Sequence, residues 1–140
     1  MTNDMNSVRK EIISTKTAPD PVGPYSQSVK AGNLLYISGQ LPIDPSSGQL
    51  TGDEITEQTR QCLENLKSIL TAAGSDLEDV LKVSVFLKDL SDFNAMNKTY
   101  AQFFYAEQPA RCCVQVAKLP LDARVEIEAI ALICPDYKAS

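Results

Sequence analysis

Apolar residues recur along this 140-residue chain with two periods, which predict two helices and six strands. Between residues 54 and 73 they return every three or four positions and form one stripe along a helix, and Gly74 stands where a left-handed C-terminal cap is expected. A second, shorter helix is predicted to begin near Ser91 or Asp92 and to bury Met96 together with its aromatic residues.

Short runs with a period of two, or of continuous apolar residues, predict the strands. Three prolines between residues 18 and 24 make that segment a loop, and Gly32-Asn33 suits the tight turn of a hairpin. One set of apolar side chains in the alternating strand is expected to face the core: Leu81, Val83, Val85 and Leu87. The six predicted strands cover residues 9–14, 25–30, 34–38, 80–88, 109–116 and 124–133.

The order of these elements predicts an α+β domain in which two helices cover one face of a mixed sheet of about six strands. Residues 127–133 are apolar at almost every position, as in a strand that is buried on both sides. Two helices cannot cover both faces of the sheet, so we expect another copy of the chain to cover the open one. The sequence therefore predicts a homo-oligomer.

Composition limits the class of protein. Residues 1–140 suffice for one domain with one core, and residues 1–8 are predicted to be a flexible N-terminal extension. The start of the chain lacks a signal-peptide pattern and no apolar run reaches transmembrane length, so we expect a cytoplasmic protein without a membrane partner. A formal net charge of −5 and a pI near 4.7 argue against nucleic acid as the main partner.

The sequence contains no histidine, which excludes Ser-His-Asp and Cys-His triads and the usual zinc sites with histidine ligands. The cysteines are expected to be reduced thiols. The adjacent residues Cys112 and Cys113 point to opposite faces of a strand, so they are not expected to share a metal ion. Any chemistry must therefore use carboxylates, arginine, backbone groups or water.

Two charged residues stand in strands that are otherwise apolar. Arg111 needs an anion, because an unpaired buried charge costs several kcal/mol. That anion is Glu126 in the next predicted strand, an acidic residue of a neighbouring chain, or a ligand that enters from outside. If the two strands form a hairpin, one register puts Arg111 and Glu126 on the same face and a slip of one residue separates them.

Five further residues are candidates of lower weight. Tyr25 leaves a stiff proline-rich loop and either lines a pocket or packs as an ordinary tyrosine. Ser38-Gly39 ends a predicted strand, where a glycine lets the backbone approach a ligand or simply stops the strand. Asn97 lies near the apolar face of the second helix and forms either a polar wall of a pocket or a helix-capping contact. Cys113 has no neighbour in sequence that would activate its thiol, so it is expected to be a small core residue.

Five blocks of the sequence follow one another in a characteristic order. They are Gly23–Gln27, Ile37–Gln40, Val85–Leu90, Asn97–Tyr100 and the long block from Pro109 to Ala129. Together they resemble the RidA/YjgF family of reactive-intermediate deaminases, and the resemblance covers the chain from about residue 12 to residue 133.

The resemblance implies a chorismate-mutase-like α+β fold that forms a homotrimer, with the sheets turned inward and a cleft at each subunit interface. It also implies an enzyme that needs no cofactor. Its substrates would be 2-iminobutanoate and 2-iminopropanoate, the latter also entering as its enamine tautomer 2-aminoacrylate, and its products the 2-oxo acids and ammonia.

The resemblance further implies roles for the candidate residues. Arg111 would bind the substrate carboxylate, and Glu126 would position and polarise the attacking water. Backbone groups at Gly39 and Cys113 would hydrogen-bond the imine or enamine nitrogen. The remaining lining residues, from more than one subunit, would be Tyr25, Ser38 and Asn97.

Two other functions compete with this one. The same family has been assigned a ribonuclease or translation-inhibitor activity, which the acidic balance and the lack of histidine oppose. A trimeric module that only binds small carboxylates would need Arg111 but not Glu126. Substituting the two residues separately distinguishes these functions.

Overall fold

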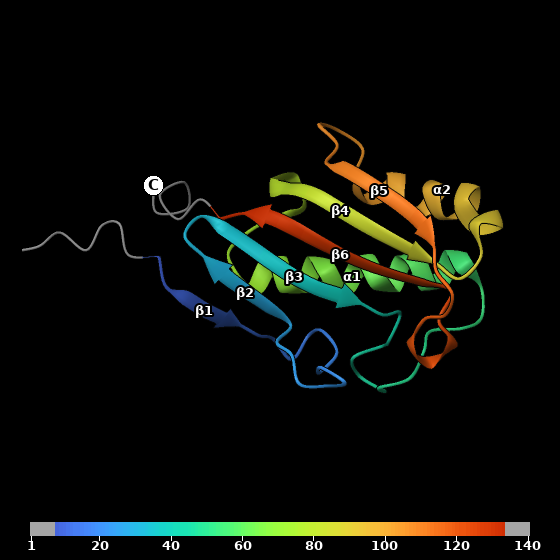
Figure 1. The fold of residues 1–140 in the computed structure, drawn as a ribbon, viewed down its shortest axis with the longest axis horizontal. Coiled ribbons are helices and arrows are strands. Elements are labelled where there is room, and N and C mark those ends of the chain that lie inside the picture. The colour runs from blue at the N-terminus through green and yellow to red at the C-terminus, as the bar shows by residue number, and fades with distance from the viewer. Residues whose placement is uncertain (1–7, 134–140) are drawn as a thin grey trace, which may run out of the picture.

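The two predicted helices and six predicted strands all form in the computed structural model, which describes residues 8–133 (Figure 1). The strands are β1 (Lys10–Ile13), β2 (Ser28–Ala31), β3 (Leu34–Gln40), β4 (Val80–Leu87), β5 (Ala110–Gln115) and β6 (Val125–Leu132). They form one sheet in the order β1-β2-β3-β6-β4-β5. The β4–β5 pair is parallel and the other pairs are antiparallel, so the sheet is mixed as predicted.

Both helices pack on the same face of this sheet, behind the strands in Figure 1. They are α1 (Ile55–Ala72) and α2 (Phe93–Phe103). The stripe of α1 buries five apolar side chains completely: Cys62, Leu63, Leu66, Ile69 and Leu70. Gly74 ends α1 with a φ of +77° and donates its N–H to the Thr71 carbonyl, which confirms the predicted cap.

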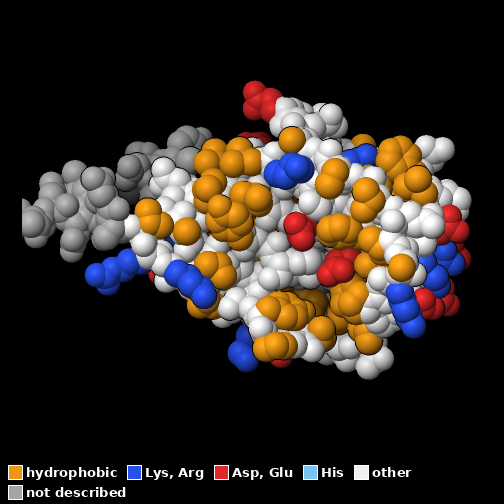
Figure 2. Space-filling view, in the orientation of Figure 1, with side chains coloured by type: hydrophobic (Ala, Val, Ile, Leu, Met, Phe, Trp, Pro, Cys, Tyr) orange, Lys and Arg blue, Asp and Glu red, His pale blue; other side chains and the backbone are white. Residues whose placement is uncertain are grey.

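The opposite face of the sheet is open in the single chain. Tyr36 on β3 is 47% exposed and Val114 on β5 is 46% exposed. Hydrophobic side chains lie across this face in Figure 2, with acidic side chains among them. On β6 only the residues that face the helices, such as Ile127 and Ala131, are fully buried. The prediction of a strand buried on both sides is therefore wrong for one chain, whereas the open face exists as expected.

The alternation predicted for β4 is wrong at one end. Leu81 was expected to face the core, but it is 42% exposed, while Val80 is buried. The cause is an irregularity in the pairing of β4 with β6 between Val80 and Lys82, which shifts the side-chain alternation by one residue. From Val83 onward the predicted alternation is confirmed.

The hairpin considered for the two charged strands does not form. β5 pairs with β4, and β4 in turn pairs with β6, so β4 separates the strands that carry Arg111 and Glu126. β5 is consequently an edge strand, and its side chains are half-buried or exposed in the single chain rather than buried.

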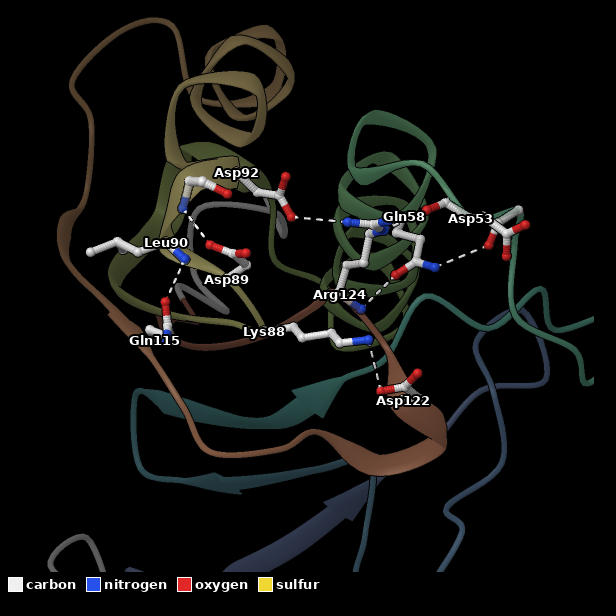
Figure 3. Close-up of polar contacts among 11 residues, drawn as sticks. Asp53, Gln58, Lys88, Asp89, Leu90, Asp92, Gln115, Asp122 and Arg124 are labelled. Atoms are coloured by element: carbon white, nitrogen blue, oxygen red, sulfur yellow. Dashed lines mark hydrogen bonds and ion pairs between the residues drawn. The ribbon is translucent and has the colours of Figure 1, made fainter.

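Polar contacts around Arg124 join both helices to the start of β6 (Figure 3). The Arg124 backbone N–H donates to Gln58 Oε1 at 2.8 Å, and its guanidinium donates to the Asp53 carbonyl. Arg124 Nη1 also lies 3.4 Å from Asp92 Oδ2, at the residue that precedes α2. Gln58 donates to the Gly52 carbonyl at 3.0 Å. These contacts link the start of β6 to α1 and to the residue that precedes α2.

None of the described helices has the length and apolar character needed to cross a membrane. Residues 1–7 of the predicted N-terminal extension, together with Cys134, lie outside the described residues.

Candidate functional site

Arg111 lies on the face of the sheet that the helices cover, at its margin. Its register partner on β4 is Val83, a fully buried core residue, and paired residues share a face. The guanidinium carbon lies 4.7 Å from the ring centre of Tyr100 and 5.6 Å from that of Phe93, both on α2. Arg111 Nη1 donates to Asn97 Oδ1 at 2.8 Å. Among residues 8–133, no carboxylate forms an ion pair with Arg111.

Cys113 lies on the same face of the sheet as Arg111, because it follows Arg111 by two residues in β5. It pairs with Val85 and packs against the core, as expected for a small core residue. Burial raises the pKa of the Cys113 thiol, and the nearby Arg111 charge only partly opposes this. A thiol that ionises less readily than usual fits a packing role better than a nucleophilic one.

Glu126 lies on the other face of the sheet. Its register partner on β4 is Phe86, three residues from Val83, and residues an odd number apart in a strand point to opposite faces. Arg111 and Glu126 of one chain therefore cannot meet, which excludes the ion pair between them that the sequence left open. Burial raises the pKa of the Glu126 carboxyl, and the adjacent charge of Glu128 raises it further.

The Glu126 carboxylate lies against the backbone of β3 at Gly39. A Cβ added to Gly39 would overlap Glu126 Oε2 and come within 2.9 Å of its Cδ. Only glycine leaves room for this close approach, so Gly39 has a spatial role beyond ending a strand; β3 in fact continues to Gln40. The neighbouring Ser38 hydroxyl donates to the Ser26 carbonyl at 2.6 Å, which fixes the loop before β2.

Tyr25 projects from that loop and is 46% exposed. Its hydroxyl accepts a hydrogen bond from the Val22 N–H at 3.2 Å, and its side chain borders a shallow hollow together with Gly39. The loop is held by Gln27, a buried residue whose amide donates to the carbonyls of Thr15 at 3.0 Å and Pro19 at 2.8 Å. Sequence reasoning did not assign Gln27 this role, although it directly follows Tyr25-Ser26.

The seven predicted residues thus form two groups in one chain. The first group, beside α2, contains Arg111, Asn97 and Cys113. The second group, at β3 and β6, contains Glu126, Gly39, Ser38 and Tyr25. The aromatic residues of α2 that touch Arg111 were predicted only as core residues. Within residues 8–133 no cluster of three or more metal-ligating side chains occurs.

Comparison with known proteins identifies the family. A model of the Endoribonuclease L-PSP family matches residues 15–133, which is most of the chain. The chain belongs to this family. A RutC family protein of Pyrococcus horikoshii is 57% identical over 122 residues, which cover 87% of this chain and 97% of that protein. The human 2-iminobutanoate/2-iminopropanoate deaminase is 47% identical over 136 residues, covering 97% of this chain and 99% of its own.

Solved structures of relatives have the same fold as this L-PSP family member. Escherichia coli TdcF with bound serine superposes with a TM-score of 0.85 at 45% identity, covering 89% of this chain and 99% of that chain. RidA from the Antarctic bacterium Psychrobacter also gives a TM-score of 0.85, at 47% identity, covering 88% and 99% of the two chains. These relatives confirm the resemblance to the RidA/YjgF family and its α+β fold. Those that are named deaminases support a small-molecule substrate.

Proposed function

We propose that this protein hydrolyses 2-imino acids and their enamine tautomers, such as 2-iminobutanoate, 2-iminopropanoate and 2-aminoacrylate, to 2-oxo acids and ammonia. The observation that carries the proposal is Arg111, a partly exposed guanidinium that is held in place and yet has no carboxylate partner among residues 8–133. Such a group is suited to a substrate carboxylate. Relatives that are named deaminases, human and mouse, favour this chemistry.

In a homotrimer, the first group of residues from one copy and the second group from the next copy can form a single site. Edge strand β5 carries Arg111 at the margin of the sheet, while Glu126 belongs to the open face. In the proposed assembly the open faces turn inward, so Arg111 of one copy approaches Glu126 of the next. Burial of exposed apolar side chains such as Tyr36 and Val114 would stabilise the trimer.

The reaction follows from the two groups. Arg111 binds the substrate carboxylate through both of its terminal nitrogens and thereby orients the imine carbon. Glu126 accepts a proton from a water molecule whose oxygen adds to that carbon. Glu126 returns this proton to the imine nitrogen, which gives a carbinolamine. Glu126 then accepts the hydroxyl proton and delivers it to the amino group, so the C–N bond breaks and ammonia leaves as the carbonyl forms. Backbone groups at Gly39 and Cys113 hydrogen-bond the nitrogen during this sequence, and the cleft is lined by Tyr25, Ser38 and Asn97.

The electrostatics of Glu126 suit a group that both takes up and returns a proton. Burial raises the pKa of its carboxyl, which moves the pKa toward the pH of the cytoplasm expected for this protein. General-base catalysis is most efficient when the pKa lies near the working pH.

Replacing Glu126 with glutamine is expected to lower kcat about a hundredfold and to leave KM nearly unchanged, because the amide keeps the shape but accepts no proton. The measurement is ammonia release from 2-iminobutanoate generated in the assay by a dehydratase. The fall in wild-type kcat as pH drops through the raised pKa of Glu126 should disappear in the variant. Glu64→Gln, an exposed change on α1, is the control. An unchanged rate of ammonia release in Glu126→Gln would show that the catalytic role assigned to Glu126 is wrong.

Replacing Gly39 with alanine is expected to lower kcat about tenfold or more, because the new methyl group displaces the Glu126 carboxylate from the β3 backbone. Gly23→Ala is a matched control, since a Cβ there meets only the Tyr25 ring at an ordinary 3.5 Å. Equal activity of the two variants in the same ammonia assay would contradict the role given to the contact between Gly39 and Glu126.

The family description also names an endoribonuclease, which makes RNA cleavage the second candidate. The net charge of −5 and the lack of histidine oppose RNA as the substrate. RNA cleavage that persists in a chain carrying both Arg111→Ala and Glu126→Gln would assign that activity to a different site or a contaminant.

A further inference from the structure

One stripe of α2 surrounds the Arg111 guanidinium. It consists of Phe93, Asn97 and Tyr100, which are four and three residues apart and therefore lie on the same side of the helix. Two of them present aromatic rings to the guanidinium, and the third accepts its hydrogen bond. The Met96 sulfur, 3.9 Å from Nη1, completes the surroundings. None of these groups carries a negative charge.

Tyr100 makes the closest ring contact and is itself firmly held. Its side chain is 6% exposed, and its ring packs on that of Phe104 with centroids 4.8 Å apart. Within the described chain its hydroxyl has no hydrogen-bond partner. Burial raises the pKa of Tyr100 to about 12, so the phenol stays neutral beside the guanidinium. The ring face is consequently what Tyr100 offers to Arg111.

An arginine side chain is long and flexible, so it must be oriented before it can bind a carboxylate with both nitrogens. A carboxylate partner would orient it but would also compete with the substrate for the same nitrogens. A ring face attracts the cation through its quadrupole and leaves the edge of the guanidinium free. The contact with Tyr100 therefore orients the charge without neutralising it.

We propose that Tyr100 is a positioning residue for substrate binding, which holds the Arg111 guanidinium by its ring face. This inference rests on the proposed function, in which Arg111 binds the substrate carboxylate. The contact that carries the role is the ring face, whose centre lies 4.7 Å from the guanidinium carbon. Phe93, at 5.6 Å, assists from the exposed side.

The test compares three variants in the ammonia assay and, separately, by calorimetric binding of 2-oxobutanoate, a product that needs no turnover. Tyr100→Leu is expected to raise KM and the Kd of 2-oxobutanoate about tenfold with kcat within about twofold of wild type, because a cation–π contact of ordinary strength is lost. Tyr100→Phe keeps the ring and is expected to match wild type. Phe103→Leu, which removes a partly buried ring of α2 that is not one of the two rings facing Arg111, is the matched control.

Two outcomes would overturn the inference: a folded Tyr100→Leu with unchanged KM and Kd, or a Tyr100→Phe as weak as Tyr100→Leu, which would transfer the role to the hydroxyl. Arg111→Ala is measured alongside. If Arg111→Ala binds 2-oxobutanoate normally, the proposed function itself fails. If Arg111→Ala loses binding while Tyr100→Leu keeps it, only the role of Tyr100 is wrong. Circular dichroism of each variant verifies that it is folded.

Discussion

Replacing Arg111 with alanine is expected to lower kcat/KM for 2-iminobutanoate about a hundred- to a thousandfold, since truncating one side of a buried, hydrogen-bonded charge pair costs about 3–4 kcal/mol. The loss should appear mainly in KM, because the guanidinium binds the carboxylate in the ground state as well as in the transition state. Ammonia release from freshly generated imine, measured over a range of substrate-generating rates, gives both constants.

The free energy of unfolding of Arg111→Ala distinguishes this functional role of Arg111 from a structural one. A guanidinium in an internal ion pair would leave a buried carboxylate unpaired when removed, at a cost of about 3–5 kcal/mol. Arg111 has no such partner among residues 8–133, so urea unfolding of Arg111→Ala is expected to show a loss of about 1–2 kcal/mol, from the contacts with α2.

Two further variants control this experiment. Arg111→Lys keeps the charge but not the planar fork, and is expected to retain part of the binding. Arg60→Ala removes an arginine of α1 that donates a hydrogen bond to Gln102 at 2.8 Å, and should leave kcat/KM unchanged. Normal turnover by Arg111→Ala would refute the assignment of the whole site.

Mixing chains that carry Arg111→Ala with chains that carry Glu126→Gln is expected to restore activity to about one quarter of wild type, although each variant alone is nearly inactive. In a random mixture, half of the clefts receive an intact Arg111 from one copy. Half of the clefts receive an intact Glu126 from the neighbouring copy, so about one quarter of the clefts contain both residues. The reason for expecting any recovery is the sheet: Arg111 and Glu126 of one chain point to opposite faces and cannot share a site.

The mixed assemblies are best made by co-expressing the two variants with different tags and purifying through both. This step removes unmixed trimers and raises the expected activity to about one third of wild type, because one of the three clefts in each mixed trimer has both residues intact. The two proteins combined after separate purification, without subunit exchange, are the control and should remain inactive. If the co-expressed assemblies are as inactive as each single variant, the two groups do not combine across copies, and the composite cleft is wrong. Light scattering on the same sample measures whether the assembly is the proposed trimer.

Local patterns were enough to predict most of the elements. The stripe of α1, the turn at Gly32-Asn33 and the cap at Gly74 depend on residues that are neighbours in sequence, so periodicity and turn chemistry determine them. The same reasoning failed at Leu81, because a strand irregularity depends on how β4 meets β6 and not on β4 alone.

Strand pairing was the part that local patterns did not provide. β4, α2 and β5 form a strand–helix–strand unit, and parallel strands joined by a helix can lie side by side. That order was readable in the sequence and would have favoured β4 as the neighbour of β5. The hairpin of the two charged strands was considered instead, because β5 and β6 are consecutive strands in the chain.

The sequence by itself determined that an arginine and a glutamate stand in apolar strands, that one sheet face lacks a cover, and that histidine chemistry is absent. Only the tertiary structure decided that Arg111 and Glu126 face opposite sides of the sheet and that rings of α2, rather than a carboxylate, hold the guanidinium. The physical reason is that the face of a side chain relative to a distant strand depends on the whole series of pairings between them, here β5 to β4 to β6.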